Sequence, residues 1–393
     1  MNTVWRNAKI AGSAVALTLS VLSIMPVATS SAAAAKTTCY QTDATHFNAA
    51  ATGSVKHVSG KTCPAGYTST AHINLAGHTL NIADQQGFYQ LFWATGVQAG
   101  VINPATLGFN VHFDELAGPA IISSVLSGSD DFTPVVSAAT WAEALDAGQK
   151  LDAIGVNQLV NPQNYWQVIV SPSAYAAGLT TPAKLAHKKI AFVAGQDSQY
   201  VVDRLLEKNH IKVSNYTPVN LPESSDIAAL LGGAVDAIVV SPITAAEAVA
   251  NGGKVIANAA GILSGYDPIL MRPSETTDPT VMAMTAAYLY AEEQIDHWIV
   301  NNQAAFTNVI FNTFFAPQPT LNNALGQGLA AVLYETGVNG FIPFTSKVTN
   351  QLDAETAQLH SDGVLVNKFK LEPSIDTALT PELTVLAKML TGN

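Results

Sequence analysis

From residue 79 onward, short apolar runs alternate with segments in which apolar residues recur every three or four positions. "TLNIAD" (79–84) precedes "GFYQLFWATGVQAG" (87–100), and "KKIAFVA" (188–194) precedes "SQYVVDRLLEKN" (198–209). A short apolar run is typical of a buried strand, and a period of about 3.6 residues is typical of an amphipathic helix. Strands that alternate with helices in this way predict an α/β fold with mostly parallel sheets.

The same alternation continues to Arg272, where the pattern becomes helical. We expect further strands at 106–115, 132–136, 165–171, 212–219, 234–241 and 254–259. We expect further helices at 119–128, 138–148, 224–233 and 243–253, and then one long helical stretch at 278–311. Asp278-Pro279 marks the start of that stretch, because proline is favoured in the first turn of a helix.

Five of the expected strand-to-helix turns carry small or polar residues. In chain order these are Gln85, Gln86, Gly87 and Phe88; Gly118 and Pro119; Ser137 and Ala138; Asp197 and Ser198; and Ser241. A helix start has unpaired N–H groups and a partial positive charge, and open α/β sheets bind ligands beyond the carboxyl ends of their strands. Five such turns predict a polar ligand site without cationic side chains. The alternative is that these residues only cap helices and shape turns.

Residues 1–35 have the composition of a signal peptide. Arg6 and Lys9 precede an apolar stretch, and an alanine-rich segment that includes Ala33 and Ala35 follows it. This order is typical of a cleaved export signal, so we expect a periplasmic or secreted mature protein. An uncleaved membrane anchor is the alternative, because the apolar stretch is long enough to span a bilayer.

Residues 36–75 are polar and weakly periodic, and we interpret them as an N-terminal extension. The two cysteines of the chain, Cys39 and Cys63, both lie in this extension. In an oxidising compartment such a pair most simply forms one disulfide, which is worth roughly 3 kcal/mol. A lipid-modified Cys39 or two free thiols are the alternatives, and two cysteines without clustered histidines make a poor metal site.

Composition and motifs limit the function classes. Hydrophobic residues make up 48% of the 393 residues, which is enough for a large core. The formal net charge is -11 and basic runs are absent from the sequence, so a nucleic-acid partner is not expected. The sequence has no G-x-S-x-G, H-E-x-x-H or G-x-x-x-x-G-K-[ST] motif, and its nine histidines are scattered. We therefore expect a protein that is not an enzyme and that has neither a metal nor another cofactor.

Three segments carry a resemblance to a known family. They are "ELAGPAIISSVLSGSDDFTPV" (115–135), "LAHKKIAFVAGQDSQYVVDRLLEKNHI" (185–211) and "VNLPESSDIAALLGGAVDAIVVSP" (219–242). In order and spacing they resemble the periplasmic substrate-binding proteins of the nitrate/sulfonate/taurine ABC-importer group, over about residues 76–275. The resemblance implies a two-lobed α/β fold of the periplasmic-binding-protein type II-like kind, with two hinge crossover strands.

The resemblance also implies an arrangement of the chain and a role. Lobe one would comprise residues 76–165 and 268–393, and lobe two would comprise residues 166–267. "YWQVIVS" (165–171) would cross into lobe two, and "GYDPILMR" (265–272) would return. The turn residues named above would contact a small solute held between the lobes, which would be sulfonate-, nitrate- or taurine-like or a related organic molecule. A monomeric chain would then deliver that solute to ABC permease subunits in the membrane.

The sequence departs from the family pattern near the fourth turn, where "GQDS" stands in place of "GS". A carboxylate at Asp197 would satisfy the helix start itself and repel an anion. This departure disfavours a sulfonate, sulfate or nitrate ligand and leaves room for a neutral or cationic one. Asp114 and Glu115 add negative charge near the second turn, unless they belong to a solvated turn.

Aromatic residues follow several of these turns and leave two interpretations open. One interpretation places all four of these aromatic residues in the core: Phe88, Trp141, Tyr165 and Trp166. In the other, Phe88 or Trp141 stacks on a planar ligand. Two further functions also stay open. One is an exported enzyme on the same fold that uses Asp114, Glu115 or Asp197 as general base, and the other is a ligand-sensing adaptor.

Overall fold

The computed structural model describes residues 37–42, 52–60, 70–159, 161–316, 323–337 and 339–391. All of them lie within one unit of the chain, Thr37–Asn393. The expected signal peptide, residues 1–35, lies outside the described residues and stays a prediction.

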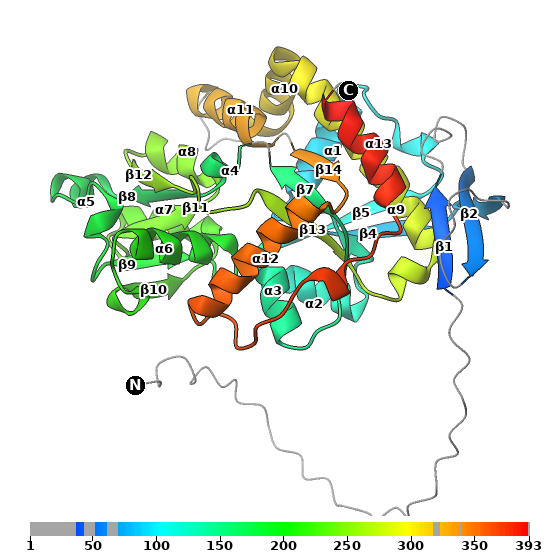
Figure 1. Ribbon diagram of the computed structural model, residues 1–393. Helices are drawn as coiled ribbons and strands as arrows, with labels where there is room; N and C mark the ends of the chain where they lie inside the picture. Colours follow the sequence, from blue (N-terminus) through cyan, green and yellow to red (C-terminus); the bar gives the residue numbers. More distant parts are fainter. Residues whose placement is uncertain are drawn as a thin grey trace, which may run out of the picture. The chain divides into compact units, whose positions relative to one another are not determined.

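The larger sheet has six strands in the order β14-β7-β13-β6-β4-β5 (Figure 1). Its strands are β4 (Thr79–Gln85), β5 (Asn110–Leu116), β6 (Phe132–Thr133), β7 (Asp152–Leu159), β13 (Tyr266–Met271) and β14 (Asn339–Ile342). β13, at the centre, is buried along its whole length, which explains the continuous apolar run "PILM".

The second sheet has five strands in the order β10-β9-β11-β8-β12. Its strands are β8 (Gln167–Val170), β9 (Lys189–Phe192), β10 (Thr217–Asn220), β11 (Ala237–Val240) and β12 (Lys254–Asn258). A third, three-stranded antiparallel sheet is formed by β1 (Thr37–Thr42), β2 (Thr52–Gly60) and β3 (Thr70–Asn74). Cys63 lies outside the described residues, so the Cys39–Cys63 disulfide stays a prediction.

The expectation of mostly parallel sheets is wrong, because both large sheets are mixed. β4 pairs in parallel with β5 and β6, and β9 pairs in parallel with β10 and β11. β7, β13 and β8 run antiparallel to their neighbours. These three strands adjoin the two connections between the sheets.

The chain passes between the two large sheets twice. The first passage lies between β7 and β8 and contains the short helix α4 (Pro162–Tyr165). The second lies between β12 and β13 and includes Gly265, whose φ of 79° places it in the left-handed region that glycine tolerates best. The cavity described below lies where these passages and the strand-to-helix turns meet.

Helices cover both large sheets. Their bounds are α1 (Phe88–Gln98), α2 (Pro119–Ser127), α3 (Ala138–Asp146), α5 (Pro172–Ala176), α6 (Asp197–Lys208), α7 (Glu223–Leu231), α8 (Pro242–Ala250), α9 (Pro279–Asn301), α10 (Gln303–Ile310), α11 (Asn323–Gly337), α12 (Ser346–Ser361) and α13 (Thr380–Thr391). Short 3-10 turns occupy Pro104–Thr106, Pro182–Lys184, Val213–Asn215, Glu275–Thr277 and Glu372–Ser374, and a π turn occupies Phe311–Phe315.

The long helix expected at 278–311 is two helices. Asn302 has φ −137° and ψ 43°, which is not helical, and it separates α9 from α10. The Asn302 side chain donates to the carbonyl of Trp298, and asparagine favours such local bonds over continued helix. The expected start at Asp278 is confirmed, because its carboxylate accepts from the amides of Thr280 (2.8 Å) and Val281 (3.2 Å).

The C-terminal helices pack against elements of both sheets. α11 contacts α8, which follows β11 of the five-stranded sheet (Figure 1). Leu359 and Leu365, at and after the end of α12, belong to the same core cluster as Phe192 and Val201. α12 also contacts α3. The lobe boundaries expected from the sequence stay a prediction.

Candidate functional site

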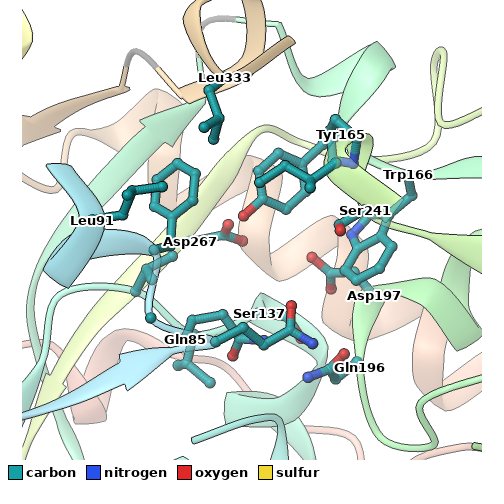
Figure 2. A pocket seen from close by; sticks show the side chains of 17 residues that line it. Gln85, Leu91, Ser137, Tyr165, Trp166, Gln196, Asp197, Ser241, Asp267 and Leu333 are labelled. Atoms are coloured by element: carbon teal, nitrogen blue, oxygen red, sulfur yellow. The ribbon is translucent and has the colours of Figure 1, made fainter. Parts of the chain in front are cut away.

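A cavity of about 110 Å³ lies where the turns after β4, β6, β9 and β11 come together. Its lining residues are Gln85, Gln86, Gly87, Phe88, Leu91, Val135, Val136, Ser137, Tyr165, Trp166, Gln196, Asp197, Ser241, Pro242, Ile243, Asp267 and Leu333 (Figure 2). Most of the wall is apolar, and a few polar groups face one space, as in small-molecule sites generally. No lysine, arginine or histidine is among these lining residues.

The start of α1 is occupied by a carboxylate of the protein. Asp84, the fully buried sixth residue of β4, accepts from the amides of Tyr89 (3.0 Å) and Gln90 (2.8 Å). Burial raises the pKa of Asp84 to about 7. The two amide bonds lower this pKa, and a weaker repulsion from Glu115 raises it. The positive end of α1 is therefore already matched with an acid before any ligand approaches.

The start of α3 is occupied by two carboxylates. Asp197, the first residue of α6, accepts from the Ser137 hydroxyl and the Ala139 amide. Asp267, in β13, accepts from the Ala138 amide. Residues from three separate elements thus meet at one helix start, and both carboxyl groups point into the same space (Figure 2).

The start of α8 is occupied in the same way by Glu223 of α7. Its carboxylate accepts from the hydroxyls of Ser241 and Thr244, both at 2.7 Å, and from the Ser241 amide at 3.3 Å. The Gln86 side chain also donates to Glu223, from the turn that follows β4. Glu223 therefore caps α8, which follows a strand of the five-stranded sheet, and also binds Gln86, which follows a strand of the six-stranded sheet.

The acids around the cavity compete for protons. Burial raises the pKa of Asp197 to about 6, against the bonds from Ser137 and Ala139. Burial, followed by repulsion from Asp197 and Glu355, raises the pKa of Asp267 well above its usual range. Burial and the charge of Asp197 raise the pKa of Glu355 to about 7, although Ser264 donates to it. Near neutral pH the three groups therefore retain protons among them rather than all ionising.

Gln196 has a buried side-chain amide that lines the cavity. The residue is 3% exposed, and within the described part of the chain neither its Oε1 nor its Nε2 has a hydrogen-bond partner. A buried amide left in this state costs on the order of 1–3 kcal/mol. This side chain is therefore available to bind a polar group in the cavity.

Seven of the residues expected at the site line the cavity: Gln85, Gln86, Gly87, Phe88, Ser137, Asp197 and Ser241. Gly118 and Pro119 do not, because the 195–196 segment covers them. A Cβ on Gly118 would lie 3.1 Å from Gln196, and one on Gly195 would lie 3.3 Å from Pro119. Ala138 and Ser198 are also outside the lining, and the Ser198 hydroxyl donates to the Val193 carbonyl (3.2 Å). Whether the seven contact a ligand stays a prediction.

The aromatic residues divide between the two interpretations. Phe88, Tyr165 and Trp166 line the cavity. Trp141 does not, because its side chain is fully buried in the core between α3 and the sheet. Asp114 and Glu115 also lie outside the lining, and Asp114 pairs with His112 at 3.2 Å on the surface.

Sequence reasoning missed several lining residues, notably Gln196, Asp267 and Leu333. Gln196 directly precedes Asp197, and Asp267 is an acid within the apolar run of β13, so both gave a signal. Leu333 comes from α11, more than 60 positions beyond any other lining residue, and nothing local to it marks the site.

Two further features concern metal ligands and membrane-spanning helices among the described residues. None of their His, Cys, Asp and Glu side chains gather in a group of three or more that could hold a metal ion. None of the helices in this part of the chain is both long enough and apolar enough to cross a membrane.

Comparison with known proteins identifies the fold. Residues 107–276 match the family described as NMT1/THI5 like. The structure resembles the alkanesulfonate-binding protein SsuA from Xanthomonas axonopodis pv. citri bound to MOPS (TM-score 0.65, 19% identity, 77% of this chain and 99% of that one). The chain has the fold of these binding proteins. It also resembles the periplasmic aliphatic sulphonate binding protein SsuA from Escherichia coli (TM-score 0.60, 17% identity, 77% and 93%). The resemblance found in the sequence and the two-lobed α/β class are thereby confirmed.

The same fold also occurs in an enzyme. The desulfurization enzyme DSZB is similar to this chain with a TM-score of 0.52 and 14% identity, over 78% of this chain and 99% of that one. No curated protein sequence matches the chain. Because one fold carries both capture and catalysis, the function has to be argued from the cavity.

Proposed function

We propose that the chain is an exported solute-binding protein of an ABC importer, which captures a small solute and delivers it to a membrane permease. The observation that carries this proposal is one cavity lined by turns of both large sheets. Gln86 and Ser137 come from the six-stranded sheet, and Asp197 and Ser241 come from the five-stranded sheet. A ligand that touches both halves would stabilise the closed arrangement over an open one.

In this proposal the two passages between the sheets act as hinges. Lobe one comprises residues 76–165 and 268–393, and lobe two comprises residues 166–267. Gly265 lies in the second passage, and a Cβ on it would lie 3.0 Å from Pro162 of the first. The two passages are therefore adjacent, as a common hinge requires. Cleavage of residues 1–35 would release a monomer to the periplasm or the medium.

Ligand-dependent stabilisation tests the proposal. A ligand that binds only the folded chain raises its melting temperature, and at 100 times its Kd it adds about 2.7 kcal/mol. The mature chain would be screened by thermal shift against sulfonates, nitrate, amines, pyrimidines and aromatic acids. Stabilisation by at least one of these solutes, and capture of permease subunits in a pull-down, are expected. A folded protein that none of them stabilises would contradict the proposal.

An enzyme on the same fold is the second candidate, because burial at the cavity raises the pKa of Asp197 to about 6. A carboxylate poised in this range can serve as a general base. The expectation from solute capture is that a bound ligand is recovered unchanged after prolonged incubation. Chemical conversion that is lost in Asp197→Asn, with folding intact, would favour the enzyme instead.

A further inference from the structure

The charges at the cavity are all of one sign. Asp197 and Asp267 line it, and neither has a lysine, arginine or histidine beside it among the lining residues. Both carboxyl groups are buried, with exposures of 5% each. An uncompensated pair of this kind is costly unless protons or a bound cation neutralise it.

Three of the helix starts whose residues line the cavity already hold carboxylates of the protein. Those of α1, α3 and α8 already bind Asp84, the Asp197–Asp267 pair and Glu223 respectively. At any of these three starts an anionic head group would have to displace the carboxylate, and anywhere in the cavity it would lie near Asp197 and Asp267. The repulsion is strong in a buried site, because the effective dielectric constant is low there.

Gln196 provides an independent indication of a ligand. Its amide is buried against the cavity, and both of its polar atoms lack a partner within the described residues. Figure 2 shows it next to Asp197 at the edge of the same space. Its Oε1 would accept from a donor group, and an ammonium group offers several donors at once.

The aromatic part of the wall suits a positively charged molecule with a carbon skeleton. Tyr165 and Trp166 present two rings at 78° to each other with centroids 5.8 Å apart, and Phe88 faces the cavity from α1. A cation over an aromatic face gains about 0.5–2 kcal/mol, and the rings also cover the carbon skeleton of a ligand.

We propose, on the basis of the solute-binding function above, that the solute is a small organic cation. Its ammonium group lies between Asp197 and Asp267 and donates to the Gln196 oxygen, and its carbon skeleton lies against Tyr165, Trp166 and Phe88. Asp267 and Asp197 select the charge, and the aromatic rings select the skeleton.

Proton exchange follows from this arrangement. The titratable groups near the pair are Glu355 on α12, which repels Asp267, and Tyr165 on α4, which lies near both carboxyl groups. Both are acids, so the pair retains protons near neutral pH. A bound cation favours the ionised carboxylates and expels those protons, whereas a bound anion would favour the protonated forms and take protons up.

Matched solutes test the charge. Propylamine, propanol and propanesulfonate form one set, and benzylamine, benzyl alcohol and phenylmethanesulfonate form another. Binding to the mature chain would be measured by calorimetry at pH 7 in two buffers with different ionisation enthalpies. The amine of at least one set is expected to bind about tenfold or more tightly than its alcohol, a difference of roughly 1.4 kcal/mol. It is also expected to release protons to the buffer.

Two isosteric variants locate the site. Asp267→Asn and Asp197→Asn are each expected to weaken amine binding about tenfold or more and to leave alcohol binding within about twofold. Asparagine keeps an oxygen that can still accept from the α3 amides, so folding is expected to persist. Asp226→Asn is the matched control, because Asp226 is a buried acid without a hydrogen-bond partner in the described chain and lies outside the cavity lining.

The outcomes separate the two proposals. Amine preference with proton release, lost in Asp267→Asn but kept in Asp226→Asn, would support the cation site. A sulfonate that binds more tightly than its amine, or that takes up protons, would overturn the cation site and leave solute binding intact. Failure of every solute in the two sets and in the wider screen would overturn both.

Discussion

Gln86 donates a side-chain hydrogen bond to Glu223, and this bond joins the turn after β4 to the helix after β10. Gln86 follows a strand of the six-stranded sheet, Glu223 follows a strand of the five-stranded sheet, and the two residues are 137 positions apart in the sequence. Gln86 has a φ of 56°, which points its backbone out of the regular strand and into the turn. The neutral Gln86 side chain, next to the buried Glu223 carboxylate, therefore helps to hold together the parts of the chain that contain the two large sheets.

Replacing this donor with an acid is expected to open the protein. In Gln86→Glu a second carboxylate would lie against Glu223, and like charges at this distance repel. We expect a larger radius of gyration in small-angle scattering and at least about tenfold weaker ligand binding. Gln90→Glu is the control, because Gln90 is exposed in the first turn of α1, where an acid is favourable. Equal effects of the two variants would contradict the role of Gln86.

The N-terminal cysteines allow a test that does not involve the cavity. If Cys39 and Cys63 form a disulfide, the mature chain has no free thiol, and reduction releases two. Cys39→Ser with Cys63→Ser is expected to lower the free energy of unfolding by about 2–4 kcal/mol, because the denatured chain gains freedom. Thiol titration and denaturant unfolding measure both quantities. Two reactive thiols in the exported, unreduced protein would contradict the pairing.

The local pattern predicted most helices and strands, because each of them has one strongly apolar face. The expected strand at 79–84 is one residue shorter than β4, for example, and the expected helix at 198–209 is shifted by one residue from α6. β7 was not predicted, although it lies inside the six-stranded sheet. Asp152, Asn157 and Gln158 interrupt its apolar run, and the fully buried Asn157 donates its side-chain amide to the Tyr89 hydroxyl, a tertiary contact that leaves no local trace in the sequence.

The site was predictable where it consists of helix starts and not where distant elements complete it. The position of Asp197 follows from the strand-to-helix pattern, as does its conflict with an anionic ligand. That Asp267 shares the α3 start with it depends on β13 returning beside β7, a long-range pairing that leaves no local trace. The loss of Gly118 from the lining likewise depends on Gln196 packing over it.

Alanine substitutions at two glycines, Gly155 in β7 and Gly328 in α11, are expected to change stability in opposite directions. A Cβ on Gly155 would overlap the Leu383 side chain of α13 and lie 3.3 Å from the Ile342 carbonyl oxygen, whereas one on Gly328 would meet no atom within 4 Å. We expect Gly155→Ala to destabilise by about 1–3 kcal/mol through overpacking. Gly328→Ala, in α11, is expected to stabilise by up to about 1 kcal/mol through helix propensity. Denaturant unfolding measures both changes in the free energy of unfolding. An unchanged value for Gly155→Ala would contradict the expected overpacking against α13.

The buried acids predict that the protein is more stable in mild acid than in mild base. Burial is the largest cause of the raised pKa values of Asp84, Glu143 and Asp203, each about 7, and of Glu293, about 8. Their ordinary values are 3.8–4.5, so between about pH 4.5 and 8 the folded chain binds more protons than the unfolded chain. Stability therefore falls as the pH rises through 7.

We expect the melting temperature to be at least about 3 °C higher at pH 5.5 than at pH 8.5, since 1 kcal/mol corresponds to about 2–4 °C in large domains. Glu293→Gln, which keeps an acceptor for the Phe341 amide, is expected to flatten the profile above pH 7. A melting temperature that rises steadily from pH 5.5 to 8.5 would contradict the assignment of these groups as buried and protonated.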